Sequence, residues 1–411
     1  MASLDIPSGS NATRRAIVIG AGPAGLMAAE VLARAGVGVT IHERMPNPAR
    51  KFLLAGRGGL NLTHSEPLEP FLSRYGAARA RLEPAIRAFP PDALKAWSEE
   101  LGVETFVGSS GRIFPKAMKA SPLLRAWLAK LGGMGVELVA RSRWLGWENG
   151  ALVLETPEGR RIERPDVAVF ALGGASWPRL GSDGSWQAAF SAHGVEIAPL
   201  KPSNSGFLIS WSGVFKEKFA AQPIKRSRFS FDGHEARGEA IATAYGLEGG
   251  AIYALSAHLR DTIEAQGSAA LEIDLMPDMS ETALATRLSG GAKDSTANRL
   301  RKAGLSSAAA SLVREDERGA SLPSAPGDLA RRIKQVRVKL TGVAPIARAI
   351  STAGGVSWDS INADYSLKVD PTAFVCGEML DWEAPTGGYL LQACFATGRA
   401  AGLGALKRTG L

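Results

Sequence analysis

The sequence predicts an α/β protein in which one nucleotide-binding domain is interrupted by a long insertion. Two observations predict this fold class. A strand, a glycine-rich turn and a helix follow one another at residues 15–36, and a second strand comes directly after them. The glycine-rich style then returns at residues 346–411, after a stretch of different composition. We therefore expect a parallel sheet to which both ends of the chain contribute.

The N-terminal part is the most strongly specified. "RAIVIG", residues 15–20, is an apolar, β-branched run that is typical of a central parallel strand. Residues 23–35 contain good helix formers and end at Gly36, a residue that favours the position after a helix. "VGVTIHE", residues 37–43, predicts the next strand. Together these segments form a βαβ unit of about thirty residues.

The turn of this unit carries the pattern GxGxxG in Gly20, Gly22 and Gly25. The first glycine permits the turn, the second lets the backbone approach a pyrophosphate, and the third allows close packing of helix on strand. Glu43 ends the second strand, where a carboxylate can accept hydrogen bonds from ribose hydroxyls. An acid here favours a ribose without a 2′-phosphate. The motif alone leaves open whether the nucleotide is a nicotinamide or a flavin dinucleotide.

Further along the chain the pattern predicts a division into domains. We expect helices at 92–101 and 121–131, short strands within 136–163, and a buried strand in 166–174. Strand-like pieces at 206–210, 228–231 and 237–242 precede a helix-rich stretch with many Ala and Ser. The prediction assigns 1–196 and 346–411 to a discontinuous Rossmann-like domain and 197–345 to an insertion, β-rich over about 197–250 and helical over about 251–335.

The segment "AFVCGEMLDWEAPTGGYLLQACFATGRAAG", residues 373–402, decides between the two nucleotides. A strand ends in Gly377-Glu378, and Gly387-Gly388 opens a helix at Tyr389. The acid can bond ribityl hydroxyls, and the helix N-terminus can face the flavin edge that becomes negative on reduction. A nicotinamide domain has no use for this element. We therefore predict FAD, held without a covalent bond because no flavin-linking His or Cys pattern is present.

Two more glycine-rich segments complete the predicted site: "RKFLLAGRGGLNLTH", residues 50–64, and "FALGGASWPRLGSDG", residues 170–184. The predicted cofactor residues are Gly20, Gly22, Pro23, Ala24, Gly25, Glu43, Arg44, Lys51, Gly56, Arg57, Gly58, Asn61, Thr63, Trp144, Ala171, Gly173, Gly174, Gly377, Glu378, Gly387, Gly388 and Tyr389. No catalytic acid or base is assigned. His64 is a candidate for facing the flavin, and Arg112 and Tyr245 are candidates for meeting the substrate.

Composition limits the other functions. The two cysteines, Cys376 and Cys394, exclude a disulfide framework and a zinc cluster, and we expect both to be small buried residues. The five histidines show no metal-ligand spacing, so no metal is expected. Residues 1–15 lack the apolar core of a signal peptide, and the apolar run 16–41 is broken by charges and glycines. We expect a cytoplasmic protein with no membrane contact.

The net charge of +8 raises the question of an anionic partner. Two basic clusters fall in the insertion. The first consists of Lys216, Lys218, Lys225, Arg226 and Arg228, and the second of Arg331, Arg332, Lys334, Arg337 and Lys339. They form either a solvated face or a track for RNA phosphates.

As a set, the motifs resemble those of a known family, the three-domain bacterial flavoproteins that include aminoacetone oxidase and the BaiN-like NAD(P)/FAD-dependent oxidoreductases. The matching motifs are "GAGPAGLMAA", "GRGGLNLTH", "GRIFPKAMKAS", "GGASWPRLGSDG", "TAYGLEGG", "TAGGVSWDSI" and "GEMLDWEAPTGGYLLQA". The resemblance implies a Rossmann-like FAD domain, an inserted β-rich substrate domain and a small helical domain. The loop around Arg57 and Leu60 differs from the usual GGGRCN, and Ala244 and Glu248 stand at altered places. These departures indicate a distinct subgroup.

Three functions remain open at this point. The first is an FAD-dependent oxidase or reductase of a small molecule, such as an amine or an enone. The second is a flavin-dependent enzyme that reduces uridine in ribosomal RNA, an activity that the resemblance implies for some family members. The third is a non-catalytic flavin module that senses redox state. No second GxGxxG is present, so NAD(P)H, if it is the reductant, docks transiently in the substrate cleft.

Overall fold

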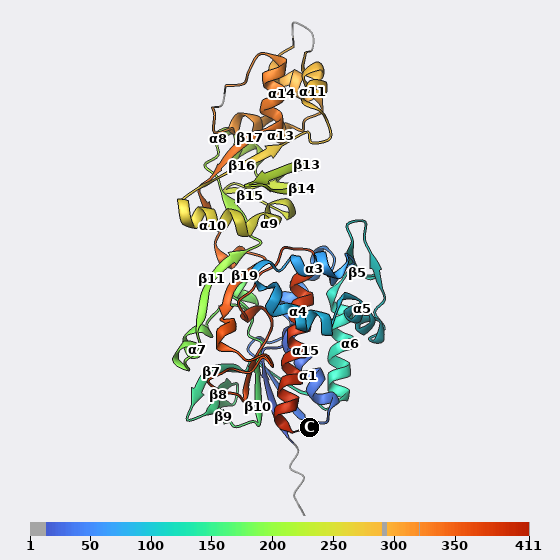
Figure 1. Ribbon diagram of the computed structural model, residues 1–411, viewed down its shortest axis with the longest axis vertical. Coiled ribbons are helices and arrows are strands. Elements are labelled where there is room, and N and C mark those ends of the chain that lie inside the picture. The colour runs from blue at the N-terminus through green and yellow to red at the C-terminus, as the bar shows by residue number, and fades with distance from the viewer. Residues whose placement is uncertain (1–13, 290–293, 320, 411) are drawn as a thin grey trace, which may run out of the picture. The chain divides into compact units, whose positions relative to one another are not determined.

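The computed structural model describes residues 14–289, 294–319 and 321–410 (Figure 1). The side chain of Arg57 lies outside the described part. The chain divides into two compact units. Unit 1 comprises the described residues up to Leu200 together with those from Ala353 onward, and unit 2 is Lys201–Thr352. Each unit has its own apolar core.

Unit 1 is built on a five-stranded sheet with the strand order β20-β10-β1-β2-β6. All four neighbouring pairs are parallel. The strands are β1 (Arg15–Ile19), β2 (Gly38–Glu43), β6 (Glu137–Ala140), β10 (Val167–Phe170) and β20 (Ala373–Val375). The C-terminal segment thus supplies one edge strand, which confirms the predicted discontinuous α/β fold. The carboxyl ends of these strands meet at one edge of the sheet, where such folds bind ligands.

Two helices from opposite ends of the chain pack closely in unit 1. They are α1 (Pro23–Arg34) and α15 (Tyr389–Thr409), and Figure 1 shows them side by side. Small residues permit the contact, since a Cβ on Gly398 would lie 2.2 Å from the carbonyl oxygen of Ala24. Because α1 follows the glycine turn, this packing holds α15 beside the turn.

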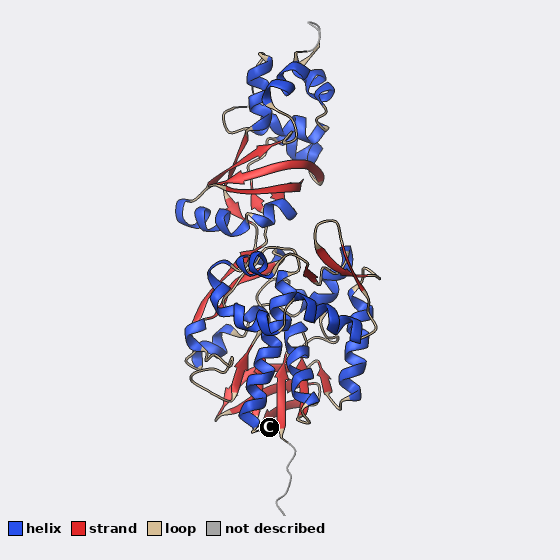
Figure 2. Cartoon of the chain, turned by 45° about the vertical axis from the view of Figure 1, so that its right-hand side comes forward, coloured by secondary structure: helices blue, strands red, loops and turns tan. Residues whose placement is uncertain are grey.

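The other elements of unit 1 surround this sheet with helices and small antiparallel sheets (Figure 2). The helices are α2 (Arg50–Ala55), α3 (Leu68–Ser73), α4 (Arg79–Ala88), α5 (Pro91–Glu100), α6 (Ala120–Gly133) and α7 (Gln187–Ala192). One sheet has the order β3 (Thr63–His64), β5 (Arg112–Pro115), β4 (Thr105–Val107), and the other β7 (Arg143–Glu148), β8 (Ala151–Thr156), β9 (Gly159–Glu163). The predicted turn at Asn149-Gly150 is confirmed, with φ of 47° and 72°.

Unit 2 contains a seven-stranded sheet in which every neighbouring pair is antiparallel. In order its strands are β17 (Val336–Leu340), β16 (Ala269–Asp274), β13 (Gln222–Phe231), β14 (His234–Ala242), β15 (Gly246–Glu248), β12 (Phe207–Leu208) and β18 (Gly342–Val343). Its helices are α8 (Gly213–Phe219), α9 (Gly250–Ala254), α10 (Ser256–Gln266), α11 (Glu281–Leu288), α12 (Thr296–Ala303), α13 (Ser307–Leu312) and α14 (Pro326–Lys334). The chain enters and leaves this unit through two paired strands, β11 (Ile197–Ser203) and β19 (Ser351–Val356).

The stretch over about 251–335, which the sequence predicts to be helix-rich, also contains one strand. Residues 269–274, "AALEID", form β16 in the middle of that stretch. Ala269, Leu271 and Ile273 are buried, as the period-two pattern of a strand requires. The strand is short and lies among Ala-rich helical sequence, so its alternation did not stand out.

Candidate dinucleotide site

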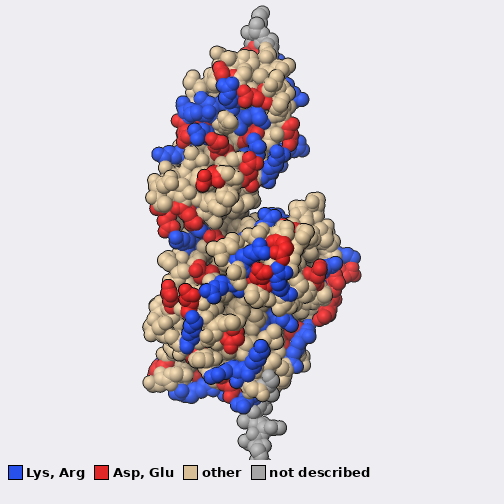
Figure 3. All heavy atoms as spheres, viewed as in Figure 1, with Lys and Arg blue, Asp and Glu red and all other residues tan. Residues whose placement is uncertain are grey.

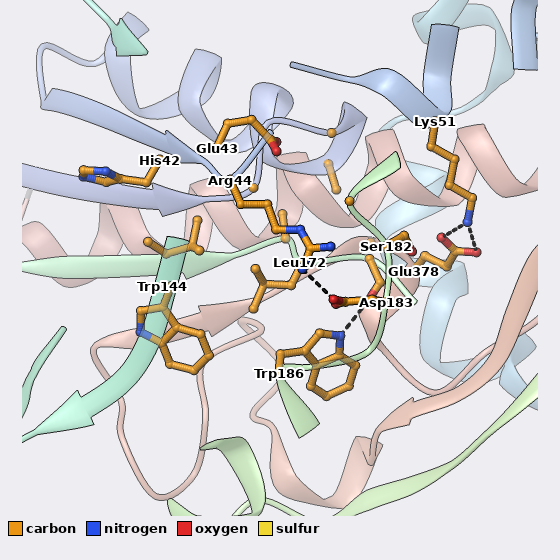
Figure 4. A pocket seen from close by; sticks show the side chains of 18 of the residues that line it. His42, Glu43, Arg44, Lys51, Trp144, Leu172, Ser182, Asp183, Trp186 and Glu378 are labelled. Atoms are coloured by element: carbon orange, nitrogen blue, oxygen red, sulfur yellow. Dashed lines mark hydrogen bonds and ion pairs between the residues drawn. The ribbon is translucent and has the colours of Figure 1, made fainter. Parts of the chain in front are cut away.

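A pocket of unit 1 lies where the carboxyl ends of β1, β2, β10 and β20 meet (Figure 4). More than half of the predicted cofactor residues line it. These are Gly20, Gly22, Pro23, Ala24, Glu43, Arg44, Lys51, Trp144, Ala171, Gly173, Gly377 and Glu378. The sequence motifs therefore converge on one cavity although they come from distant parts of the chain.

The three glycines of the turn have different roles. A Cβ on Gly20 would lie 2.4 Å from the carbonyl oxygen of Ala171, and a Cβ on Gly25 would lie 2.0 Å from that of Gly20. Both glycines are needed for packing. A Cβ on Gly22 would meet no described atom within 4 Å. Gly22 also precedes α1, whose N-terminus receives no side-chain cap in the described structure. This open, uncapped helix end is suited to an anion such as a pyrophosphate.

Glu43 is held between the glycine turn and the end of β2. Its two carboxylate oxygens accept hydrogen bonds from the backbone N–H groups of Ala21, at 3.0 Å, and Met45, at 2.8 Å. Burial raises the pKa of Glu43, and these two hydrogen bonds act against the rise. The carboxylate is fixed at the position where the sequence predicts an acceptor for ribose hydroxyls.

An ion pair joins β2 to the loop that follows β10. Arg44 donates to Asp183 at 2.7 Å and to the carbonyl oxygen of Pro178 at 3.4 Å (Figure 4). Burial raises the pKa of Asp183, but hydrogen bonds from Arg44 and Ser185 outweigh it and hold that pKa below its ordinary value. The loop is thereby fastened along the side of the pocket.

A second ion pair lies at the other end of the pocket. The ammonium of Lys51, in α2, donates to the Glu378 carboxylate at 2.6 and 2.8 Å and to the hydroxyl of Ser176 at 2.6 Å. Glu378 follows β20, so this contact fixes the acid that the sequence assigns to a ribityl chain. Figure 4 shows Lys51 and Glu378 together, apart from Glu43 and Trp144.

Some polar atoms of this pocket have no partner among the described residues. They are the Trp144 indole Nε1 and the Ser182 hydroxyl, both buried. The observations that fit a dinucleotide are the open space at Gly22 and the uncapped N-terminus of α1, which suit a pyrophosphate.

Several of the other predicted residues lie near the N-terminus of α15. Gly388 (φ 99°) lies so close to β3 that a Cβ on it would be 2.6 Å from the Cα of Thr63. Thr63 donates to Gln392 at 2.8 Å, and the buried Oδ1 of Asn61 has no partner among the described residues. The Tyr389 hydroxyl donates to Glu66 at 2.5 Å. The structure thus brings the loop of residues 61–64 to the glycine-opened helix.

Two glycines of the 50–64 loop lie elsewhere. A Cβ on Gly56 would be 2.7 Å from the Cβ of Ala120 in α6, so packing explains this glycine. Gly58 is exposed, and neither residue lines the pocket. The side chain of Arg57 lies outside the described part, so the predicted role of this residue stays a prediction. Gly25 and Gly174 are likewise outside the pocket lining.

His64, the candidate for facing the flavin, and Tyr245, a candidate for meeting the substrate, have partners within the protein. His64 uses both ring nitrogens: Nδ1 accepts from the N–H of Glu66 at 3.1 Å, and Nε2 donates to the carbonyl oxygen of Ser110 at 3.0 Å. Tyr245 belongs to unit 2, where its hydroxyl donates to Glu248. Burial, followed by that hydrogen bond, raises the pKa of Tyr245 to about 12.

Sequence analysis missed several residues of the pocket. They are His42, Ser142, Arg143, Leu172, Ser182, Asp183 and Trp186. His42 shares a hydrogen bond of 2.8 Å with the Ser142 hydroxyl, and burial lowers its pKa. Ser182 and Asp183 stand within "GGASWPRLGSDG", a segment that had been singled out for its glycines alone. Its polar residues were the signal that could have revealed them.

The two cysteines also line the pocket, at the end of β20 and in α15. Burial raises the pKa of Cys376, and it raises that of Cys394 to about 12. Both thiols therefore stay protonated at neutral pH. Cys376 is buried, as predicted, whereas Cys394 is half-buried. The described residues include no group of three or more His, Cys, Asp or Glu able to hold a metal ion. No described helix is both long and apolar enough to cross a membrane.

The architecture of unit 1 is that of a dinucleotide-binding protein of the Rossmann type. It combines a parallel sheet, a GxGxxG turn, a carboxylate at the end of β2 and a pocket at the carboxyl ends of the strands. The chain belongs to the HI0933-like family: the family model described as "HI0933-like protein Rossmann domain" matches residues 14–404. This confirms the predicted family, and with it the expected class of flavoprotein oxidoreductases.

Individual relatives agree with this placement. The chain is 26% identical to the 3-dehydro-bile acid delta(4,6)-reductase of Clostridium scindens over 95% of this chain and 98% of that one. Among solved structures it is similar to the 3-ketosteroid delta1-dehydrogenase of Sterolibacterium denitrificans, with a TM-score of 0.51 and 13% identity over 96% and 100% of the two chains. It is also similar to Mycobacterium smegmatis Sdh1, with a TM-score of 0.50 and 15% identity over 97% and 70%. These structural likenesses show the fold.

Proposed function

We propose that unit 1 binds FAD without a covalent bond and that the protein is a reductase of a carbon–carbon double bond in a small organic molecule. One observation carries the cofactor assignment: the glycine turn, Glu43 and Glu378 line one pocket at the carboxyl edge of one sheet, and Cys394 in α15 lines it as well. A nicotinamide site would explain the first two of these features and leave the last two without a purpose.

The chain's own residues then divide the binding work. The uncapped N-terminus of α1 at Gly22 stabilises the negative charge of a pyrophosphate, and Glu43 accepts hydrogen bonds from ribose hydroxyls. Glu378, oriented by Lys51, accepts hydroxyls of the ribityl chain. The N-terminus of α15, opened by Gly388, favours negative charge beside it. FAD, when bound, supplies hydride transfer, while the protein provides position and electrostatics.

The substrate class rests on the curated relative. Its name describes a reductase acting at double bonds of a 3-dehydro bile acid, and the match extends along 95% of this chain. At 26% identity this supports the reaction type, so we propose an enone-type substrate and assign no particular molecule. NAD(P)H is the proposed reductant, docking transiently because the sequence has no second dinucleotide motif. The cytoplasmic location remains a prediction.

The RNA-modifying alternative drew on the resemblance and on the two basic clusters, and the geometry of the second cluster favours a structural role for several of its residues. Lys334 donates to Asp274 at 2.9 Å and to the carbonyl oxygens of Met276 and Met279. Arg332 pairs with Asp316 at 3.4 Å, and Arg337 with Glu272 at 3.1 Å. On the face seen in Figure 3, acidic side chains lie next to the basic ones. We therefore do not propose RNA as the substrate.

The test is a spectrum of the purified protein, followed by anaerobic titration with NADH and NADPH. We expect flavin absorption bands that bleach with one of the two nucleotides and return when an enone such as 2-cyclohexenone or a 3-keto-4-ene steroid is added. Reoxidation by ribosomal RNA alone would replace this proposal with RNA modification. Bound flavin that shows no turnover with any reductant and oxygen would favour the non-catalytic redox-sensing module. A protein that cannot be loaded with FAD would overturn the cofactor assignment.

A further inference from the structure

Unit 2 contains a surface hollow of about 690 Å³, a volume within the range of small-molecule sites. It is lined in part by residues of the first basic cluster, to which the proposed function gives no role. The lining comes from α8, β13, the turn after β16 and the segment that leads into α13. Figure 1 shows α8, α13, β13 and β16 close together.

The hollow lies where two paired strands part. The pairing of β13 with β16 covers Arg228 to Ser230. β16 then ends at Asp274, and the chain turns away through residues 275–279. Lys334 holds this turn, because its ammonium donates to the carbonyl oxygens of Met276 at 2.9 Å and Met279 at 2.7 Å. One wall of the hollow is therefore fixed by the packing of unit 2.

Three cationic side chains line the hollow, those of Lys218, Lys225 and Arg226. Lys225 and Arg226 stand in a β-bulge, since the pairing of β13 with β14 shifts register between Ile224 and Ser227. Arg226 adopts a φ of 52°, which residues other than glycine rarely do. Bulges of this kind redirect side chains, and here two neighbouring cations line the same hollow.

These cations are not neutralised in the way that the second cluster is. Lys225 lies 4.0 Å from Glu239, and the two side chains are 66% and 49% exposed. Lys218 and Arg226 are exposed and have no carboxylate within that distance in the described part of the chain. Asp278 is the one acid among the described lining residues. The hollow therefore keeps an excess of positive charge that a solvent-borne anion can reach.

Most of the remaining lining is apolar. It includes Phe219, Leu275, Met276, Met279 and Leu305. Methionine side chains adapt to the shape of an apolar ligand. A phosphate backbone would use the cations and leave this apolar surface without a partner, whereas an apolar chain with an anionic head would use both.

We propose that this hollow binds a small amphipathic carboxylate, a molecule with an apolar chain and one anionic head. The chain lies against Met276 and Met279, and Lys218 and Arg226 hold the carboxylate. A guanidinium can donate two parallel hydrogen bonds to such a head, and each buried CH₂ of the chain adds affinity. The site belongs wholly to unit 2, so the proposal does not rest on the proposed FAD function.

The first test titrates the purified full-length protein with decanoate by isothermal titration calorimetry, at concentrations below those at which decanoate forms micelles. We expect decanoate to bind. Butyrate, which lacks most of the chain, and decan-1-ol, which lacks the charge, should each bind at least about tenfold more weakly. No binding of decanoate, or binding of decan-1-ol as tight as that of decanoate, would overturn the proposal.

Variants then locate the bound molecule. Lys218→Gln and Arg226→Gln should each weaken decanoate about threefold, and the double variant about tenfold, because both cations are exposed. Lys216→Gln is the matched control: it removes the same charge from the same helix, does not line the hollow and should change the affinity by less than about 1.5-fold. Met279→Gln keeps the carbonyl oxygen that Lys334 binds and should weaken decanoate about fivefold. Unchanged affinity in the double variant, or an equal loss in Lys216→Gln, would contradict the assigned site.

Two macromolecular ligands are tested alongside, vesicles of phosphatidylglycerol and ribosomal RNA. Binding of either that disappears in the double variant, without any binding of decanoate, would show that the cations serve a membrane surface or RNA and would overturn the proposal. Protein that cannot be loaded with FAD should still bind decanoate, so failure of this site and failure of the proposed function are distinguishable.

Discussion

Lys51 and Glu378, which lie 327 positions apart in the chain, form an ion pair of 2.6 Å across one end of the pocket. Their side chains are 27% and 13% exposed, so both groups have lost much of their hydration. Lys51 comes from the helix after β2, and Glu378 follows the C-terminal strand β20. The pair therefore joins the two separated segments of unit 1 at the place where the flavin half of the cofactor is proposed to bind.

Replacing Lys51 by Met should impair both folding and binding. The variant leaves the half-buried Glu378 without its cation, and we expect the free energy of unfolding of the apoprotein to fall by about 1–3 kcal/mol. FAD affinity should fall about tenfold, because the carboxylate loses the group that orients it. Urea unfolding and FAD titration measure the two effects.

Lys130 provides the control for this variant. It forms an ion pair of 2.8 Å with the buried Glu30, is 25% exposed and does not line the pocket. Lys130→Met should lower stability by a similar amount and leave FAD affinity unchanged. If Lys51→Met kept full FAD affinity, Glu378 would have no role in holding the ribityl chain.

The glycine turn permits a test that separates packing from binding. In Gly22→Ala the new methyl group enters open space, so the apoprotein should fold with wild-type stability. FAD affinity should still fall at least tenfold, because the methyl occupies the path of the pyrophosphate. In Gly25→Ala the methyl would lie 2.0 Å from the carbonyl oxygen of Gly20, so this variant should lose stability even without ligand. Thermal unfolding without FAD measures the stability of each variant, and the shift that FAD produces measures binding. Wild-type FAD binding by Gly22→Ala would contradict the proposed site.

The structure could be predicted best where all the residues that determine an element are close together in the sequence. The βαβ unit was predictable because its strand, turn and helix are local, and Gly22 could be assigned to a ligand from spacing alone. Lys51 and Glu378 were each singled out, but their ion pair was not, since nothing in a sequence states which charges meet across 327 positions. The site's location was predictable from the rule that parallel strands bind ligands at their carboxyl ends.

Other features could not be read from the sequence. Gly56 belongs to a glycine-rich loop of the type that approaches a ligand, yet its contact is with Ala120 of α6, which only tertiary packing reveals. The second basic cluster had no acid in its own stretch, but Asp274, Glu272 and Asp316 reach it from neighbouring strands and loops. Charge patterns along a chain therefore overstate free charge whenever the neutralising acids come from another element.

The Arg44–Asp183 ion pair should govern how long FAD stays bound. Asp183→Asn removes the charge that fastens the loop to β2, and we expect the FAD dissociation rate to rise about fivefold to tenfold with little change in the association rate. Stopped-flow release of FAD into an excess of an apoprotein that binds FAD tightly, such as apo-glucose oxidase, measures it. Asp359→Asn is the control, since Asp359 pairs with Arg81 at 3.2 Å while 80% exposed and should change nothing.

The same pair predicts a pH dependence of defined sign. The pKa of Asp183 is lowered in the folded protein. The stabilisation that its ion pair with Arg44 provides is therefore fully present at pH values above the ordinary pKa of Asp, and it is lost as the pH falls through the lowered pKa. The titration of Asp183 should therefore leave the FAD dissociation rate of the wild type unchanged from about pH 8 to pH 5. The rate should rise only at pH values below the ordinary pKa of Asp, near 4. Asp183→Asn should lack that acidic acceleration. Acceleration between pH 7 and 5 that disappears in this variant would contradict the assigned shift.

The two thiols should be nearly inert in the native protein. With the pKa of Cys394 at about 12 and that of Cys376 also raised, little thiolate exists at pH 8; Cys376 is buried and Cys394 is half-buried. Alkylation by iodoacetamide should be slower than in the guanidinium-unfolded chain by a factor on the order of a thousand. Mass spectrometry of samples quenched over time measures both rates, and Cys394→Ala should retain NAD(P)H-dependent bleaching of the flavin. Rapid native alkylation that FAD blocks, together with loss of bleaching in Cys394→Ala, would show that a thiol takes part in the chemistry.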